Sequence, residues 1–421
     1  MKKFIIEKSD ALSGKISVQG SKNSVLPLLA ATVLIKGKSR LHNCPELSDV
    51  RAAVKILESL GCTVERAGDT LTVDASEITG NEIPQELMSE MRSSVMFLGA
   101  ILGRTGSAVL SAPGGCDIGK RPIDIHISAV SDLSAHTRRE CGKLFFAAEN
   151  GLKGNTVTLA FPSVGATENM ILAACTAKGK TVIYNAACEP EIADLVSFLN
   201  LAGASVRMYG NGLIEIEGVR QLHGAEYTVM ADRIAAGSYL LAAAATGGSL
   251  TVNNIFPQHI ASLIPVLGKM GCKTEIGDNF VSVSAPKRLK AVSRTGTMPY
   301  PGFPTDLQAP LCASLCRAEG DSVVTENIFE ARFKHVPELK KLGADITVQG
   351  KTAFIKGVPC LCASRLNALD LRGGFALIIA ALQAQGTSEI INTEHIDRGY
   401  ECPEKVLTEL GAKIKRVEDY G

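Results

Sequence analysis

The sequence predicts an α/β protein in which sheets wrap around buried helices, an inside-out α/β barrel, and two observations support this fold class. First, an apolar stretch rich in Ala and Leu, a glycine and a short β-branched run recur in that order six times, about once every 70 residues. Second, these stretches, of which LLAAAATGG is one, are apolar nearly all round, as buried helices are. The glycines of the six copies are Gly37, Gly106, Gly179, Gly248, Gly320 and Gly386.

A second helix follows each strand, and its pattern is amphipathic. In AAVKILESL, for example, Val54, Ile56 and Leu57 are spaced to face a core, whereas Lys55 and Glu58 fall on the opposite side. Each second helix runs into a small-residue turn and then another strand. We therefore expect each copy to form helix, strand, helix and strand, with Gly in the left-handed position closing each helix. The turn residues are Gly61, Ser134, Gly203, Gly271, Gly343 and Gly411.

Composition and charge exclude several classes of protein. The chain has 421 residues, of which 46% are hydrophobic and 21% charged, as in a globular protein large enough for more than one domain. A formal net charge of +1 argues against a nucleic-acid or membrane-surface protein held by bulk charge. No stretch has the pattern of a signal peptide or of a membrane span, so we expect a cytoplasmic location.

The cysteines do not predict a metal centre. The sequence has 12 of them, scattered mostly through apolar patterns, as reduced core thiols are. Two close pairs, Cys312 with Cys316 and Cys360 with Cys362, lack a second pair at zinc-ligand spacing. We therefore expect no metal.

Charged and polar residues gather just before the buried helices, where unpaired N–H groups and a partial positive charge favour anions. Asp, Asn and Ser at these places are ordinary helix caps, and capping alone accounts for Asp232 or Asp306 taken singly. Basic residues are unfavourable there unless an anion or a paired carboxylate is close, so the set predicts an anionic ligand. The basic residues are Lys22, Arg92, Arg233 and Arg372.

The stretch APGGCDIGKRPIDIH, residues 112–126, predicts an exposed loop with a reactive thiol. Its proline and glycines disfavour helix and strand. Lys120 and Arg121 follow Cys116 closely, and nearby positive charge favours the thiolate. The alternative is that Cys116 is one of many cysteines and happens to lie in a loop. The residues alone leave both interpretations open.

GGCDIGKRPIDIH closely resembles the active-site loop of the UDP-N-acetylglucosamine 1-carboxyvinyltransferases, which belong to the EPSP synthase family of enolpyruvyl transferases. The motifs GSKNSVLPLLAA, PSVGATEN, FPTDLQA and HIDRGYE are similar to those of the same family and occur in the same order. The resemblance implies two domains of three repeats each, 22–230 and 1–21 with 231–421, with the active site in a cleft between them. No linker composition marks these boundaries in the sequence itself.

The activity that the resemblance implies is transfer of the enolpyruvyl group of phosphoenolpyruvate to the 3-hydroxyl of UDP-N-acetylglucosamine, without any cofactor. Cys116 matches the family's general acid, Asp306 is the candidate base, and Lys22 and Arg398 match charge-stabilising positions. The implied phosphoenolpyruvate ligands are Lys22, Asn23, Arg121, Arg332, Arg372 and Arg398. The implied ligands of UDP-N-acetylglucosamine are Asn23, Arg92, Arg121, Pro122, Ile123, Asp124, Ile125, Ser163, Val164, Gly165, Asp306 and Ile328.

Retention of the loop cysteine implies sensitivity to the epoxide antibiotic fosfomycin, and the loop glycines imply a lid that closes over the substrates. The chain departs from some family members in carrying Phe161 and Pro162, where they have a basic residue before the equivalent of Ser163.

Two alternatives remain at this point. One is 3-phosphoshikimate 1-carboxyvinyltransferase, against which stand the cysteine loop and the PSVGATEN and HIDRGYE motifs. The other is a non-catalytic paralogue that binds the nucleotide sugar, against which stands the joint retention of Lys22, Cys116, Asp306 and Arg398. The sequence does not predict the oligomeric state.

Overall fold

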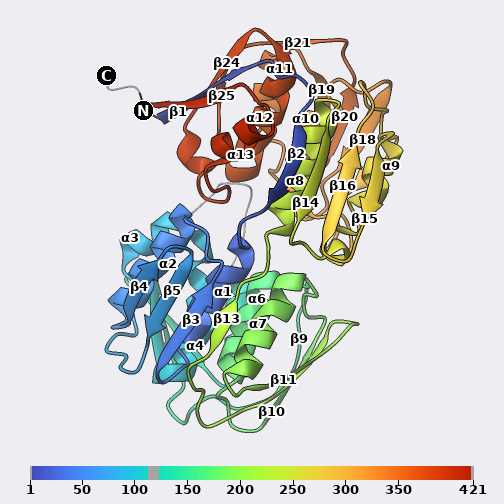
Figure 1. Cartoon of the computed structure of the whole chain (residues 1–421). Coiled ribbons are helices and arrows are strands. Elements are labelled where there is room, and N and C mark those ends of the chain that lie inside the picture. Colours follow the sequence, from blue (N-terminus) through green and yellow to red (C-terminus); the bar gives the residue numbers. More distant parts are fainter. Residues whose placement is uncertain (1, 112–122, 419–421) are drawn as a thin grey trace. The chain divides into compact units, whose positions relative to one another are not determined.

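The computed structural model describes residues 2–111 and 123–418, and these fall into two compact units. The N/C unit comprises 2–19 and 231–418, and the middle unit comprises 20–111 and 123–230. Figure 1 colours the chain along its length, so that the N/C unit combines dark blue with yellow to red. Each unit is described below by itself.

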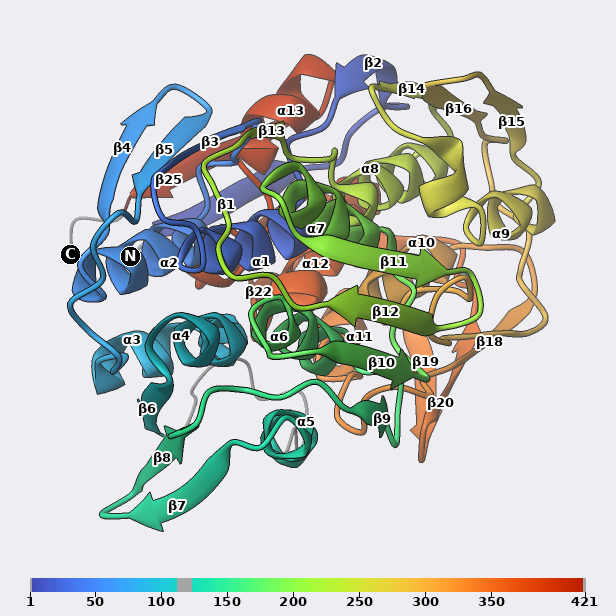
Figure 2. The same cartoon turned by 90° about the horizontal axis from the view of Figure 1, so that it is seen from below.

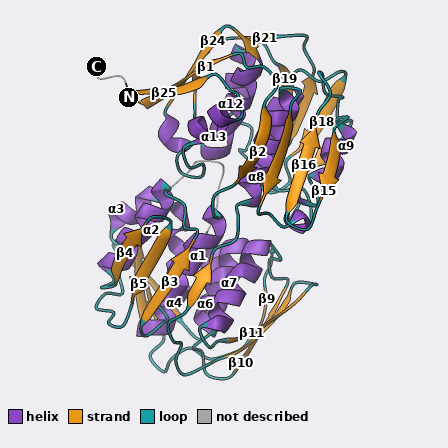
Figure 3. Ribbon diagram, viewed as in Figure 1, coloured by secondary structure: helices purple, strands orange, loops and turns teal. Residues whose placement is uncertain are grey.

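The apolar stretches form buried helices, as predicted. In α1, α6, α8 and α12 almost every side chain is buried, because the sequence offers no polar face that could turn towards water. Figure 3 shows these helices in purple and the strands in orange. The buried helices are α1 (Lys22–Thr32), α4 (Phe97–Thr105) and α6 (Val164–Ala174) in the middle unit, and α8 (Arg233–Ala245), α10 (Gln308–Leu315) and α12 (Leu371–Gln383) in the N/C unit.

The amphipathic second helices also form, each after a strand. The strands that follow the buried helices are β3 (Lys38–His42), β6 (Ser107–Ser111), β10 (Lys180–Tyr184), β14 (Ser249–Asn253), β18 (Asp321–Thr325) and β24 (Thr387–Ile391). The second helices are α2 (Ser48–Ser59), α5 (Asp124–Asp132), α7 (Pro190–Leu201), α9 (Ile264–Lys269), α11 (Val336–Lys341) and α13 (Pro403–Glu409).

A strand follows each second helix, as predicted, but after five of the six it is the first strand of a hairpin, whereas β25 follows α13 alone and pairs with β1. The first strand of a hairpin is an edge strand with little or no buried side chain, so it leaves a weak pattern. Figure 2 shows one hairpin, β7–β8, beside α5. The hairpins are β4 (Thr63–Ala67) with β5 (Thr70–Asp74), β7 (His136–Glu140) with β8 (Lys143–Ala147), β11 (Ser205–Tyr209) with β12 (Leu213–Glu217), β15 (Lys273–Ile276) with β16 (Phe280–Ser284), and β19 (Asp345–Gln349) with β20 (Thr352–Lys356).

The N-terminal segment completes two sheets of the N/C unit. Strand β1 (Lys2–Glu7) lies between β24 and β25 (Ile414–Glu418), and the side chains of Phe4 and Ile6 alternate into the core. Strand β2 (Ser13–Ser17) pairs in parallel with β14. A similar parallel strand joins other sheets, namely β13 (Glu226–Thr228) on β3, β9 (Thr156–Thr158) on β10, β17 (Thr295–Gly296) on β18, and β22 (Arg365–Asn367) on β24.

The predicted left-handed turn residues are confirmed after the second helices, and only in part after the buried helices. The residues Gly61, Ser134, Gly203, Gly271, Gly343 and Gly411 all have a positive φ. Among the first set, Gly106 directly caps α4, whereas Gly37, Gly179, Gly320 and Gly386 lie some residues beyond their helices. The residue with positive φ after α8 is Gly247 and not Gly248. Buried helices here end in tight i→i−3 turns, such as Leu34 N–H to the Ala31 carbonyl, so the glycine is needed later.

Several short elements complete the described chain. They are α3 (Gln85–Glu90), the 3₁₀ turns η1 (Arg92–Met96), η2 (Pro257–Ile260), η3 (Thr305–Leu307) and η4 (Thr393–His395), and the two-stranded sheet of β21 (Leu361–Cys362) and β23 (Ala384–Gln385). Among the described residues, every helix is too short or too polar to cross a membrane.

Candidate functional site

In the N/C unit, Asp306 is the acceptor of two buried arginines. It lies in η3 just before α10, and its Oδ1 and Oδ2 accept hydrogen bonds from Arg332 Nη2 at 2.6 Å and from Arg372 Nη2 at 3.0 Å. The side chains of Arg332 and Arg372 are 5% and 2% exposed. Capping was the alternative explanation for Asp306, but the N-cap positions of η3 and α10 are occupied by Pro304 and Leu307.

In the described structure the two guanidiniums have further N–H donors besides those that bond to Asp306. Arg332 Nε and Arg372 Nε and Nη1 are buried without a hydrogen-bond partner there. Burial by itself lowers the pKa of Arg372, but Asp306, Tyr400 and Asp232 outweigh it and raise that pKa, so the charge is kept. The Arg372 guanidinium also lies 5.3 Å from the ring centroid of Tyr400. Buried, charged and incompletely bonded donors are what a carboxylate or phosphate needs.

Other acids at the helix starts do act as caps. Asp232 accepts from the backbone N–H groups of Ile234 at 2.8 Å and Ala235 at 2.9 Å, as the capping hypothesis for it predicted. Asp370 does the same at the start of α12, and Ser163 accepts from Ala166 N–H at the start of α6. Asp306 therefore differs in role from its counterparts in the repeat.

Glu326 organises the surroundings of Asp306, and the sequence analysis did not find it. Its side chain is 2% exposed and accepts hydrogen bonds from Thr297 Oγ1 (2.9 Å), Thr305 Oγ1 (2.9 Å), Ile328 N–H (2.8 Å) and Phe329 N–H (3.1 Å). It thereby fixes the neighbour of Asp306 and the backbone of Ile328, which is half-buried. A signal existed, because most copies of the repeat close this strand on an Asn with positive φ, whereas this copy places Glu before its Asn.

In the middle unit, Lys22 is paired with an acid. It begins α1, and its Nζ lies 2.8 Å from Oδ2 of Asp49 in α2, which is buried. Asn23, also predicted as a ligand, follows it and is half-buried. The basic residue at this helix start is thus accompanied by a carboxylate, one of the two outcomes that its position predicted.

The starts of α5 and α6 lie together. Ile123, Asp124 and Ile125 form the first turn of α5, and Ser163, Val164 and Gly165 form that of α6. The link is His126, whose Nδ1 is 2.7 Å from Asn169 Nδ2 and whose ring would lie 3.0 Å from a Cβ atom at Gly165. The structure therefore brings together two segments that the family resemblance assigns to one nucleotide-sugar site.

Behind these helix starts the middle unit is acidic. Glu168 in α6 is 2% exposed, and its pKa is raised well above the usual value of 4.5 by burial and by the charges of Glu191 and Glu189. Asp194 nearby accepts hydrogen bonds from Tyr227 Oη at 2.7 Å and from Ser24 Oγ. The pKa of Asp194 is raised chiefly by burial.

Some predicted residues cannot be placed. Cys116, Arg121 and Pro122 lie outside the described residues, and for Arg92 the structure describes only the backbone at the start of η1. Arg398 is half-buried in the segment after η4.

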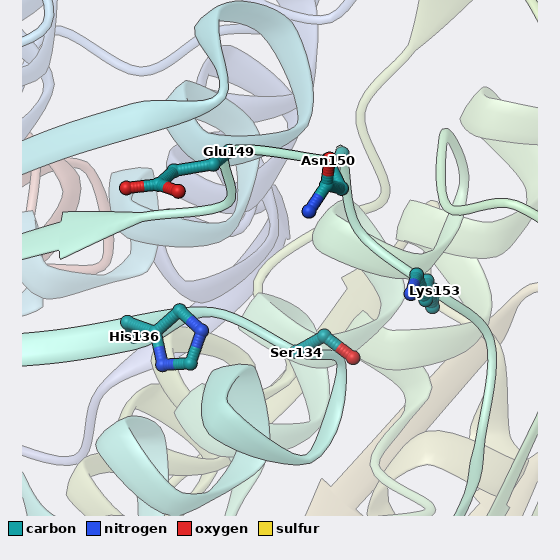
Figure 4. A pocket seen from close by; sticks show the side chains of 6 residues that line it. Ser134, His136, Glu149, Asn150 and Lys153 are labelled. Carbon is teal, nitrogen blue, oxygen red and sulfur yellow. The ribbon is translucent and has the colours of Figure 1, made fainter.

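A surface hollow of about 310 Å³ in the middle unit is not the predicted site. Figure 4 shows His136 and Ser134 on one side of it and Glu149 and Asn150 on the other. The hairpin register places Ala147 opposite Ser107, at the end of α4 that is remote from the helix starts. The hollow is lined by Ser134, His136, Glu149, Asn150, Gly151 and Lys153, none of which was predicted to bind substrate.

Comparison with known proteins gives a consistent result over the full length. Residues 6–407 match the family described as EPSP synthase (3-phosphoshikimate 1-carboxyvinyltransferase). The chain is 48% identical to UDP-N-acetylglucosamine 1-carboxyvinyltransferase 2 of Caldanaerobacter subterraneus subsp. tengcongensis, covering 99% of this chain and 100% of the relative. It is 46% identical to UDP-N-acetylglucosamine 1-carboxyvinyltransferase of Trichlorobacter lovleyi, covering 100% of both.

Solved structures agree on the fold. The enolpyruvyl transferase NikO from Streptomyces tendae superimposes with a TM-score of 0.88 at 25% identity, covering 99% of each chain. EPSP synthase from Acinetobacter baumannii superimposes with a TM-score of 0.75 at 19% identity, covering 99% of this chain and 100% of that one. The likeness to the second structure, at this identity, concerns the fold alone.

Proposed function

The chain belongs to the UDP-N-acetylglucosamine 1-carboxyvinyltransferases of the EPSP synthase family, and we propose that it transfers the enolpyruvyl group of phosphoenolpyruvate to the 3-hydroxyl of UDP-N-acetylglucosamine, the first committed step of peptidoglycan synthesis. The observation that carries this proposal is identity of 48% over 99% of the chain to a relative of that name. The buried arginines beside Asp306 support it, because both substrates are multiply anionic.

The proposed chemistry is addition followed by elimination. The sugar 3-hydroxyl loses its proton to Asp306 while its oxygen bonds to C2 of phosphoenolpyruvate, and C3 gains a proton from the Cys116 thiol. The C2–O bond to phosphate then breaks as C3 returns a proton to the Cys116 thiolate, which restores the double bond, and inorganic phosphate leaves with the proton that Asp306 had taken. Positioned acid and base groups of this kind contribute on the order of 10²–10⁴ in rate.

Lys22 and Arg398 are proposed to stabilise negative charge on the phosphate during both steps. Asp49, which pairs with Lys22, would then keep that ammonium oriented. Arg332 and Arg372 are proposed to bind phosphoenolpyruvate through the donors that Asp306 leaves unused.

Asp306 can serve as the base only if the two arginines stabilise its ionised form less strongly once the substrate is bound. A carboxylate bonded to two guanidiniums is a weak base, because both bonds favour its ionised form. An anion bound to the remaining donors of the same guanidiniums adds negative charge beside Asp306 and so raises the basicity of that carboxylate. We therefore propose that phosphoenolpyruvate binding prepares the base for the nucleotide sugar.

The test is phosphate release with both substrates, compared with each substrate alone. Release that requires both supports the proposal, and a new enolpyruvyl ether in the product by mass spectrometry identifies the transfer. Shikimate 3-phosphate serves as the second acceptor, since the matching family is described by that activity. Release with shikimate 3-phosphate alone would assign the other activity, and tight UDP-N-acetylglucosamine binding without any release would favour a non-catalytic paralogue.

A further inference from the structure

One side chain from the N-terminal segment, that of Gln19, forms hydrogen bonds with the backbone next to Arg398. The Nε2 of Gln19 donates to the Gly399 carbonyl at 3.2 Å, and its Oε1 accepts from the Glu401 N–H at 2.6 Å. The backbone carbonyl of Gln19 accepts in turn from the N–H of Asp232, at 2.9 Å. All of these residues lie in the N/C unit.

The same short segment is fixed on its other side by close packing. A Cβ atom at Gly399 would lie 2.8 Å from the side chain of Leu371 in the first turn of α12, so the Gly399 backbone packs closely against that side chain. Tyr400 stacks on Phe375 with ring centroids 4.1 Å apart, and its hydroxyl lies 2.8 Å from Ser238 Oγ. The residues that follow Arg398 are therefore held between α12 and Gln19.

We propose that Gln19 is a positioning residue, which fixes the backbone beside Arg398 so that its guanidinium meets the phosphate of phosphoenolpyruvate. An amide can donate and accept at once, and both bonds of Gln19 go to the residues that flank Tyr400. The N-terminal segment itself is already anchored by the ladders of β1 and β2, so it does not depend on this side chain for its place. This inference rests on the role of Arg398 in the proposed function.

The middle unit offers a matched control. Asn200 at the end of α7 makes the same pair of bonds to one backbone residue, donating to the Val206 carbonyl and accepting from the Val206 N–H, both at 2.9 Å. No predicted site residue adjoins it in the sequence. Loss of the two Asn200 hydrogen bonds should therefore lower the stability of the protein without affecting catalysis.

The experiment compares Gln19→Met with Asn200→Leu, since both changes keep bulk and delete two hydrogen bonds. We expect both variants to lower the thermal midpoint by a similar amount. Only Gln19→Met should lower turnover, by about 10-fold. It should also raise the KM for phosphoenolpyruvate, whereas the KM for UDP-N-acetylglucosamine should stay within about twofold of the wild-type value. In an Arg398→Lys background, Gln19→Met should cost less than about threefold, because the residue it positions has already been changed. Gln19→Glu keeps the acceptor and should retain an intermediate turnover.

A Gln19→Met enzyme with the turnover of Asn200→Leu, or one whose loss is undiminished in the Arg398→Lys background, would overturn the proposal. If Gln19→Met does not fold, Gln19→Glu decides by the same two comparisons. Phosphoenolpyruvate binding measured by calorimetry separates this inference from the proposed function. Weaker binding in Gln19→Met supports the positioning role of Gln19 even if the wild type shows no transfer, whereas unchanged binding together with unchanged turnover rejects it.

Discussion

In the N/C unit the carboxylate of Asp306 lies between two buried guanidiniums, whereas in the middle unit the carboxyl of Glu168 lies near those of Glu189 and Glu191. Both groups lie near the start of a buried helix, and the two helices, α6 and α10, hold the same place in different copies of the repeat. The comparison indicates that the repeat fixes where polar groups gather, whereas individual substitutions decide their charge. At these helix starts the N/C unit has buried guanidiniums, whereas the middle unit has buried carboxyl groups.

Asp306→Asn should produce the largest effect, because it removes the one carboxylate shared by Arg332 and Arg372. Asparagine can accept hydrogen bonds but cannot neutralise the guanidiniums or take the hydroxyl proton. We expect turnover to fall by about 10² or more, and the free energy of unfolding to fall by about 2–4 kcal/mol. Stability, nucleotide-sugar affinity and turnover should be measured on one preparation. Near wild-type turnover in a folded variant would place the base elsewhere.

Glu326→Ala should come next, because four donors lose their acceptor at once. The half-buried N–H groups of Ile328 and Phe329, the half-buried Thr305 hydroxyl and the fully buried Thr297 hydroxyl would lose this partner, at a cost of about 2–4 kcal/mol. Turnover should fall by about 10-fold, because the backbone on both sides of the site loosens.

The control for Glu326→Ala is Asn185→Ala in the middle unit. Asn185 closes the corresponding strand with a φ of 55° and donates to the Leu159 carbonyl at 2.8 Å. Alanine there should lower stability by about 1–2 kcal/mol and leave turnover of the folded protein unchanged. Equal losses of turnover in the two variants would remove the distinction between these strand ends.

His335 gives the N/C unit an acid-sensitive element. It is buried at the start of α11 with both ring nitrogens unpartnered in the described structure. Burial lowers its pKa from 6.5 to about 4, Asp370 opposes this, and Arg332 adds to it. Because the unfolded chain binds the proton more tightly, stability is lost as the pH falls from about 6.5 towards 4. Between pH 7 and pH 5 we expect the free energy of unfolding to fall by about 2 kcal/mol because of this residue.

Urea unfolding at the two pH values measures this contribution, with His335→Gln as the variant that cannot titrate. The pH dependence should be smaller in the variant by that amount. A wild type and a variant with equal acid sensitivity would mean that other groups carry it. The two groups that face the imidazole, Arg332 and Asp370, are unchanged in this comparison.

Prediction from the sequence succeeded for features that depend on local sequence alone. The buried helices and the turns at Gly61 or Gly411 follow from periodicity and from the demands of a positive φ. The hairpins were missed because an outer strand such as β4 buries no side chain. Among the site residues, a charge at a helix start indicated an anion or a paired acid, but no spacing rule brings Arg332 to Asp306 across 26 positions. The partners of Gln19 and Glu326 are likewise fixed only by the fold, although the departure of Glu326 from the repeat pattern could have marked its position.

The smallest effect should come from Glu168→Gln, the carboxyl-to-amide change that matches Asp306→Asn in the other unit. Burial first, and then Glu191 and Glu189, raise the pKa of Glu168 above its usual 4.5, so the folded protein holds a proton that the unfolded chain releases. Stability from this group is therefore full below about pH 4.5 and is lost as the pH rises towards the folded pKa. Glutamine is neutral at every pH, so the variant should resist rising pH better than the wild type. Each kcal/mol recovered corresponds to about 2–4 °C in thermal midpoint for a unit of this size. Midpoints measured from pH 6 to 9 test this, and a variant that loses stability more steeply than the wild type would show that Glu168 is ionised in the fold.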